Sequence, residues 1–193
     1  MEAGNMRKLF ITLCVPILVY LIWPYMALLK LYFGLESANK KVVMEEIHWP
    51  TIRKGIEKNL NLFVKEVLNK NLKQKNLQIS FSAISLTRQI ADEIATPEGI
   101  IYLYHNPNKY ADQIRKIFKK VSEPKQLSPP IKEKPLKLEG PNVPSLWERI
   151  DYIFFIDFSH FKASFKIKNQ SFTIIWKRQG FDWKVVLLNF PLA

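Results

Sequence analysis

The feature that most constrains this chain is an apolar stretch near its start, from Leu9 to Leu29, that contains no charged residue. Arg7 and Lys8 precede this stretch and Lys30 follows it. A helix of this length rises about 31 Å at about 1.5 Å per residue, close to the hydrocarbon thickness of a bilayer. We therefore expect Leu9 to Leu29 to span a membrane and to attach the rest of the chain to the lipid bilayer.

The end of the stretch bears on whether it is an anchor or a cleaved signal peptide. A signal peptide has an apolar run of about 7–15 residues followed by a cleavage site of the A-x-A type. This run is longer, Tyr25 and Met26 precede Ala27, and Ser37-Ala38 is the best later candidate. We expect an uncleaved single-pass anchor, with an exported and cleaved protein as the alternative. The positive charges on the two sides nearly balance, so the positive-inside rule does not assign the orientation.

Composition limits what the remainder can be. The chain has 193 residues, of which 29 are basic and 17 acidic, for a net charge of +12. The part after residue 33 has the usual size of one domain. Most of the excess charge is lysine, which attracts anionic lipid, nucleic acid or an acidic polymer but also forms ordinary solvated surfaces. The single cysteine, Cys14, lies in the apolar stretch, which excludes a disulfide or a cysteine-rich metal site within one chain.

The region up to residue 121 has the three- and four-residue apolar spacing of helices. The segment from Met26 to Ile47 predicts a helix that continues from, or is hinged at, Gly34, before His48-Trp49-Pro50 interrupts it. Further helices are expected at residues 50–70, 79–94, 97–105 and 109–121. The first half of the second of these alternates in polarity, so a strand is its alternative.

The end of the chain has the pattern of a sheet. Six of the twelve prolines lie in residues 122–145, which is typical of a linker or a long extended loop. The following segments alternate apolar with basic or polar residues, and predict strands at 150–158, 161–168, 172–176 and 183–188. Consecutive strands with short turns form an antiparallel meander, and helices followed by strands predict an α+β fold with helices packed on one face of a four-stranded sheet.

These patterns divide the chain into four parts. Residues 1–33 are the expected membrane anchor. Residues 34–121 form the helical part of a single α+β domain, and residues 146–193 form its antiparallel β part. The segment between them, 122–145, is the expected linker or loop.

Several short motifs occur in a recognisable order along the chain: Trp23-Pro24-Tyr25, His48-Trp49-Pro50 with Arg53, Thr96-Pro97-Glu98-Gly99, Arg178-x-Gly180-x-x-Trp183-Lys184, and Leu188-x-x-Pro191. Over nearly its whole length the chain resembles the bacterial domain of unknown function 2939 family. The second motif of that family is Asp-Trp-Pro, and His48 stands here in place of the aspartate. The resemblance implies an anchored or exported bacterial envelope protein, with the domain periplasmic or extracytoplasmic, and implies no activity.

The order of helices and strands, closing with Trp183-Lys184, is also similar to the NTF2-like α+β cone. That analogy implies a pocket and no particular reaction. Asp151 and Asp157 flank the first expected strand, and they would be the acids of such a pocket if they pointed inward.

The sequence contains none of the patterns that carry catalysis. His48, His105 and His160 lack metal-ligand spacing, and the glycines are scattered rather than forming a phosphate loop. A Ser/His/Asp or Cys/His motif is also missing from the sequence. We therefore expect no enzymatic activity, no cofactor and no metal.

The basic residues of the β part are the remaining candidates for contacts. Alternation places Lys162, Lys166, Lys168 and Lys184 on the solvent face of the expected sheet. These lysines would contact anionic lipid or an acidic envelope component. The aromatic residues between them lie on the opposite, core face by the same alternation, which disfavours single-stranded nucleic acid as the partner.

Three functions are consistent with the sequence. The first is a non-enzymatic, membrane-anchored envelope protein that acts by interaction or binding, with its basic face toward anionic lipid or an acidic partner. The second is an NTF2-like pocket domain that binds or converts a small ligand. The third is an exported interaction protein with a cleaved signal. The oligomeric state is not predicted.

Overall fold

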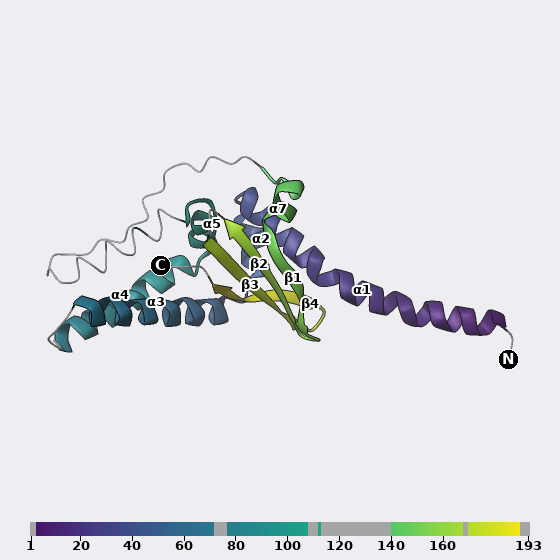
Figure 1. The fold of residues 1–193 in the computed structure, drawn as a ribbon, viewed down its shortest axis with the longest axis horizontal. Helices are drawn as coiled ribbons and strands as arrows, with labels where there is room; N and C mark the ends of the chain where they lie inside the picture. The colour runs from purple at the N-terminus through teal and green to yellow at the C-terminus, as the bar shows by residue number, and fades with distance from the viewer. Residues whose placement is uncertain (1–2, 72–76, 108–111, 113–139, 168–169, 190–193) are drawn as a thin grey trace.

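The computed structural model describes residues 3–71, 77–107, 112, 140–167 and 170–189. Within these residues the chain forms six helices and a four-stranded antiparallel sheet (Figure 1). The elements are α1 (Ala3–Glu36), α2 (Lys40–Glu46), α3 (Trp49–Asn71), α4 (Leu77–Ile94), α5 (Pro97–His105), α7 (Val143–Arg149), β1 (Ile150–Asp157), β2 (His160–Ile167), β3 (Gln170–Gln179) and β4 (Asp182–Asn189). The α+β fold expected from the sequence is confirmed.

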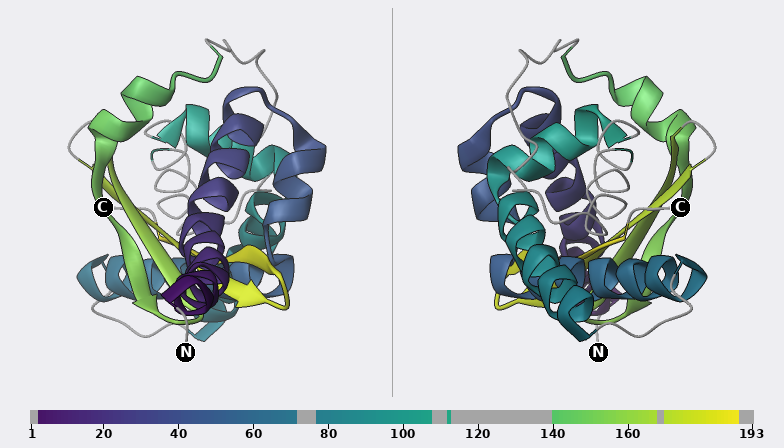
Figure 2. Two further views of the ribbon diagram at one scale, coloured as in Figure 1. Left: turned by 90° about the vertical axis from the view of Figure 1, so that its right-hand side faces the viewer. Right: turned by 90° about the vertical axis from the view of Figure 1, so that its left-hand side faces the viewer.

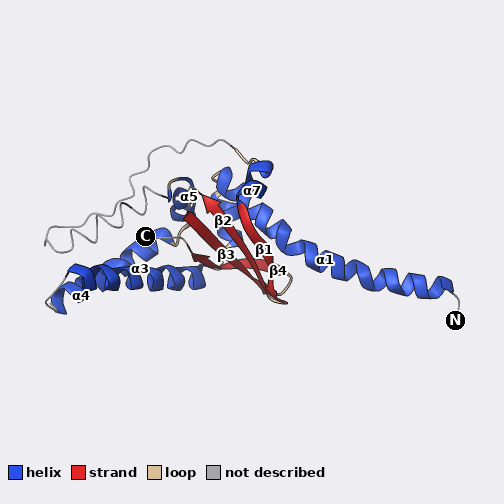
Figure 3. Cartoon of the chain, in the orientation of Figure 1, coloured by secondary structure: helices blue, strands red, loops and turns tan. Residues whose placement is uncertain are grey.

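The sheet is a meander with the strand order β1-β2-β3-β4, as its short turns predicted (Figure 3). Phe161 pairs with Trp176, and Trp176 pairs with Val185, so these three fully buried side chains form a row across the inner face. Lys162 and Lys166 alternate with the buried residues of β2 and belong to the opposite, outer face. The alternation read from the sequence therefore assigned the two faces of β2 correctly.

Helix α1 crosses the inner face of the sheet with its C-terminal half (Figure 2). Tyr25 of α1 meets the Phe161 ring edge-on, with ring centroids 4.9 Å apart, and Leu28, Leu31 and Leu35 are buried. The last part of the apolar stretch therefore belongs to the core of the domain, on the N-terminal side of the boundary expected at residue 33. A helix face rich in leucine is equally suited to lipid and to a protein core, so composition did not separate the two.

Within the described residues, one helical segment, Cys14–Glu36, is long and apolar enough to cross a membrane by length and composition. The core helix of a soluble protein and a signal sequence pass the same criterion. Figure 1 shows that the N-terminal half of α1 extends well beyond the sheet, whereas the C-terminal half lies against it.

The helical part matches the predicted elements closely. Helices α3 and α4 cover the expected ranges 50–70 and 79–94 and form a pair that projects to one side of the sheet (Figure 1). The strand alternative for the first half of α4 is wrong. Helix α5 has the predicted bounds, and the Thr96 side chain accepts a hydrogen bond from Gly99 N at 3.0 Å, the cap that its sequence predicted. The predicted helix at 109–121 lies almost entirely outside the described residues.

Two predicted boundaries differ from the structure. Helix α1 continues through Gly34 to Glu36, and the chain turns at Ala38, which has a positive φ of 50°. The segment expected to be a linker, 122–145, lies outside the described residues up to 139, and its last three residues begin α7. The Asn142 side chain caps α7 by accepting from Ser145 N at 3.1 Å, a start signal that the surrounding prolines concealed.

The interruption predicted at His48-Trp49-Pro50 has a definite structural role. Ile47 forms a parallel bridge with Val185, and His48 N donates to Val185 O at 2.9 Å, so this short segment extends the sheet beyond β4. Helix α3 then begins at Trp49, with Pro50 in its first turn.

Candidate functional site

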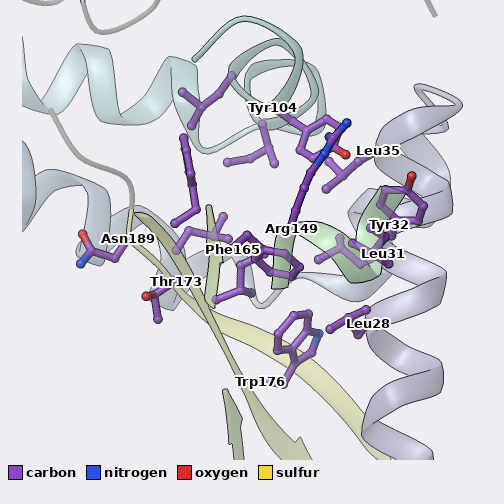
Figure 4. Close-up of a pocket in the computed structure, with 16 residues that line it drawn as sticks. Leu28, Leu31, Tyr32, Leu35, Tyr104, Arg149, Phe165, Thr173, Trp176 and Asn189 are labelled. Carbon is purple, nitrogen blue, oxygen red and sulfur yellow. The ribbon is translucent and has the colours of Figure 1, made fainter. Parts of the chain in front are cut away.

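The most clearly formed candidate site is an apolar cavity of about 100 Å³ between the helices and the inner face of the sheet. Figure 4 shows it enclosed by α1 on one side and the strands on the other. It is lined by Leu28, Leu31, Tyr32, Leu35, Ile100, Leu103, Tyr104, Leu146, Arg149, Phe165, Phe172, Thr173, Ile174, Trp176, Leu188 and Asn189. The cavity is smaller than the ~150 Å³ apolar cavity that holds one benzene, so its volume matches only a hydrocarbon segment smaller than benzene.

The helix wall of the cavity follows from the spacing of residues on α1. Leu28, Leu31 and Leu35 recur at three and four residues, so they lie on one face of the helix, and Tyr32 lies beside them. All four side chains are buried. This wall is therefore built from the continuation of the same apolar helix that was predicted to enter the membrane.

The sheet wall comes from the inner faces of β2, β3 and β4. Phe165, Ile174 and Trp176 are among the lining residues from these strands, and Figure 4 shows Phe165 and Trp176 beside the cavity. A shift of register between Ile175 and Trp176 interrupts the regular pairing of β3 with β4. Such bulges bend a strand locally, and this one lies within the stretch of β3 that lines the cavity.

Polar groups lie at the rim of the cavity next to α5 and α7. The Tyr104 hydroxyl donates to Glu36 Oε1 at 2.6 Å, and the Tyr32 hydroxyl both donates to Asn142 O and accepts from Asn142 N at 2.9 Å. Burial, reinforced by the Glu36 carboxylate, raises the pKa of Tyr104 far above its usual range. The Tyr104 phenol therefore remains neutral at physiological pH. Both hydroxyls tie the elements of the rim together through these hydrogen bonds.

Arg149 supplies the positive charge of the rim. Its side chain extends toward Tyr104 in Figure 4, and it forms no ion pair with any residue that the structure describes. An exposed guanidinium beside an apolar cavity is suited to an anion attached to a hydrophobic group. The residues that line the cavity include no nucleophile paired with a base.

Three of the four lysines predicted to contact anions have partners within the protein. Lys162 lies over the Tyr152 ring at 5.4 Å, and Lys166 pairs with Asp151 at 3.2 Å. Lys184 donates to Glu45 O at 2.7 Å. Lys168 lies outside the described residues. These lysines thus remain candidate contacts, but their charges are partly committed to local interactions.

The candidate acids and histidines are not gathered in the cavity. Asp151 is bound to Lys166, and Asp157 caps the turn between β1 and β2 by accepting from Ser159 N and His160 N. His48 and His105 belong to other contacts, with Thr51 Oγ1 and with Leu35 O. Within the described part of the chain, no group of three or more histidine, cysteine or acidic side chains is placed to hold a metal ion.

The residues of the short sequence motifs have structural positions. The Trp49 indole donates to Met44 O at 2.9 Å, Arg53 pairs with Asp92, and Trp183 is buried. A Cβ at Gly99 would lie 2.5 Å from Glu93 O, so the chain has room only for glycine there. Most of these residues hold junctions between elements, which explains their type without assigning them a ligand.

Sequence reasoning did not identify Tyr104 or Arg149 as parts of a site. Tyr104 lies in an apolar helix, and Arg149 directly precedes a strand, so neither stands out by spacing. Their meeting at one rim depends on the packing of α5 and α7 around α1. No model of a known protein family, no curated protein and no solved structure matches this chain. The resemblance to the domain of unknown function 2939 family therefore stays a prediction from its motifs.

Proposed function

We propose that this protein is a non-enzymatic, single-pass membrane-anchored domain that binds a small amphipathic ligand. The apolar part of the ligand occupies the cavity between α1 and the sheet, and its anionic group lies at Arg149. We infer from the resemblance stated above that the domain belongs to the bacterial envelope, and we propose that it lies on the outer side of the inner membrane. This proposal combines two functions considered from the sequence: the membrane-anchored binding protein, and the NTF2-like pocket domain that binds a small ligand.

One observation carries the proposal: α1 forms a wall of the cavity and is also the helix that is apolar enough to cross a membrane. The four α1 residues of the lining follow Tyr25, whose ring packs edge-on against Phe161 of the sheet. An amphipathic molecule from the bilayer would therefore follow a continuous apolar helix surface to reach the cavity. The cost of exposing its hydrocarbon to water would be small along this route.

The basic outer face has a lesser role in this proposal. Lys162, Lys166 and Lys184 are each engaged by a ring, a carboxylate or a carbonyl. Exposed pairs of this kind contribute little energy, so the lysines still attract anions over a distance. They would hold the domain near an anionic membrane surface, whereas the cavity would select the ligand.

Ligand binding is tested with the full chain in lipid nanodiscs. The probes are linear alkyl carboxylates of increasing chain length and alkyl trimethylammonium ions of the same lengths, with binding followed by calorimetry and by the unfolding temperature. We expect the carboxylates to bind and to raise the unfolding temperature more than the matched cations. Equal effects of the two series would contradict a role for Arg149, and absence of binding by both would contradict the proposal.

Two matched pairs of variants locate the site. Ile174→Phe fills the cavity, whereas Ile175→Phe adds the same bulk at the next residue, which is not part of the lining. Arg149→Gln removes the rim charge, whereas Arg88→Gln removes an exposed arginine that pairs with Glu57. We expect Ile174→Phe to abolish binding and Arg149→Gln to weaken carboxylate binding about tenfold, or about 1.4 kcal/mol, with both controls unchanged.

The placement of the domain is tested separately. A reporter that is active only outside the cytoplasm, fused after residue 193, should be active if the domain lies on the outer side of the membrane. Activity of a cytoplasmic reporter at the same position would reverse the orientation and leave the cavity assignment untouched.

A further inference from the structure

The point where α1 meets the end of the sheet can be located at Tyr20. The Tyr20 hydroxyl donates to Phe158 O, and its ring stacks on Phe155 with centroids 5.9 Å apart. The Arg178 guanidinium lies 5.0 Å from the centre of the same ring. On the N-terminal side of Tyr20, side chains such as Leu18 are exposed. Tyr20 therefore marks the place where α1 leaves the domain, and the N-terminal part of α1 extends beyond the sheet in Figure 1.

The apolar part of α1 beyond the domain is short for a membrane crossing. Leu9 to Val19 is 11 residues by number, or about 17 Å of helix, against about 30 Å of hydrocarbon. The remainder of the apolar stretch, from Tyr20 to Leu29, lies alongside the sheet. If α1 crosses a bilayer in this packed form, the end of the domain around Tyr20 must therefore enter the lipid.

That end of the domain carries two exposed phenylalanines at the tips of turns. Phe158 lies in the turn between β1 and β2 and is 89% exposed, and Phe181 lies in the turn between β3 and β4 and is 85% exposed. The two turns are neighbours, because Arg178 N donates to Ser159 O at 2.8 Å. They lie together at one end of the sheet in Figure 1.

Helix α1 adds further apolar surface next to these turns. Ile22, Trp23 and Met26 are exposed on α1. Trp23 and Met26 line the same groove as Asp182 and Trp183 at the start of β4, directly after Phe181. We call Phe158, Phe181, Trp23 and Met26 the apolar tip.

Folding of the turns does not explain the phenylalanines. Asp157 Oδ1 shapes the first turn by accepting from Ser159 N at 2.7 Å and His160 N at 2.8 Å. Gly180, with a positive φ of 63°, shapes the second turn. Neither turn requires an apolar side chain at position 158 or 181, and turn residues are usually polar. Both positions nevertheless hold an exposed phenylalanine.

We propose that the apolar tip inserts into the boundary between headgroups and acyl chains of the membrane that holds α1. Aromatic side chains favour this boundary, and the nearby Lys177 and Arg178 are suited to lipid phosphates. Asp157 and Asp182 lie at the same end, but Asp157 is already bound by the turn and by His160. The inference rests on the membrane anchoring proposed above, and it adds a second contact between domain and lipid.

The test uses the native cysteine as an internal reference. One sample carries an environment-sensitive fluorophore on Cys14, which lies in α1 beyond Tyr20. The other samples carry Cys14→Ser together with Phe158→Cys, Phe181→Cys or Leu62→Cys, each labelled in the same way. Leu62, exposed on α3, is the matched control away from the tip. The proteins are reconstituted in bilayers of equal parts phosphatidylcholine and phosphatidylglycerol, with lipids brominated near the headgroup as quenchers for positions 158, 181 and 62 and lipids brominated in the middle of the acyl chain as quenchers for Cys14.

We expect the lipid quencher to reduce the fluorescence at positions 158 and 181 at least twofold and to leave position 62 unchanged. Quenching at Cys14 without quenching at positions 158 and 181 would contradict insertion of the apolar tip, but it would still be consistent with α1 as the membrane anchor. Absence of quenching at Cys14 as well would overturn the anchor itself. Protection of 158 and 181 from an aqueous quencher without lipid quenching would show that another protein surface, such as a second copy, covers the tip, and would also overturn the proposal.

Discussion

The two halves of α1 have nearly the same apolar composition and opposite surroundings. In the N-terminal half, Leu18 is 56% exposed, and its neighbours Ile17 and Val19 are exposed as well. In the C-terminal half, Leu31 is 2% exposed, and it lines the cavity against the sheet. One helix thus offers its apolar surface to two environments. The comparison teaches that one unbroken apolar run can supply part of a domain core and also an apolar helix surface that no described part of the protein covers.

The largest expected effect comes from making the same truncation in both halves. Leu31→Ala removes a side chain from the core and should lower the free energy of unfolding by about 2–5 kcal/mol. Leu18→Ala removes the same atoms from an exposed site and should change it by less than about 0.5 kcal/mol. Denaturant unfolding of the full chain in a mild detergent measures both. Equal effects of the two substitutions would show that the C-terminal half of α1 is not packed as described.

A smaller effect is expected from the close approach of α1 to α2. A Cβ at Gly34 would lie 2.8 Å from Val42 Cγ1, so Gly34→Ala forces a shift and should cost about 1–3 kcal/mol. Gly55→Ala, on α3, meets nothing within 4 Å and should stabilise the protein by about 0.4–1 kcal/mol. The measurement is the change in the unfolding midpoint of each variant relative to the unchanged protein. We expect a decrease for Gly34→Ala and an increase for Gly55→Ala. Stabilisation by Gly34→Ala would mean that the end of α1 is looser than its buried position indicates.

The smallest effect concerns the turn where α1 leaves the domain. Hydrogen bonds from Ser159, foremost from its backbone N–H, and the adjacent His160 lower the pKa of Asp157 from 3.8 to about 2. Because the folded pKa lies below the unfolded one, the ionised Asp157 stabilises the fold above about pH 4, and this contribution is lost as the pH falls toward 2. We expect Asp157→Asn to flatten the dependence of the unfolding midpoint on pH in this window. An unchanged pH dependence of the unfolding midpoint would show that the ionised Asp157 does not stabilise this turn.

Much of the fold was predictable because its signals are local. The alternation of Phe161 and Phe165 with Lys162 and Lys166 identifies a strand and its faces, since side chains of a strand alternate between the two sides of a sheet. The Thr96-Pro97 start of α5 satisfies free N–H groups within a few residues. Each of these features depends on neighbours in the sequence and is therefore visible there.

The candidate cavity was not predictable by the same reasoning. Leu31 on α1, Tyr104 on α5 and Arg149 at the end of α7 are far apart in the chain, and each has an ordinary local explanation. The Tyr104 hydroxyl finds Glu36 across 68 positions. Such a contact depends on how the helices pack on the sheet. The spacing of apolar residues in the sequence does not indicate that packing.

The sequence by itself determined that the chain has an apolar helix followed by an α+β domain with a four-stranded meander. Only the tertiary structure decided how that helix is divided, with Leu28 and Leu31 in the core and Leu18 beyond it. The physical reason is that transfer out of water is favourable for an apolar side chain whether it enters lipid or protein. Hydropathy indicates that a side chain favours leaving water. Whether that side chain enters lipid or the protein core depends on which surfaces pack against the helix in the folded protein.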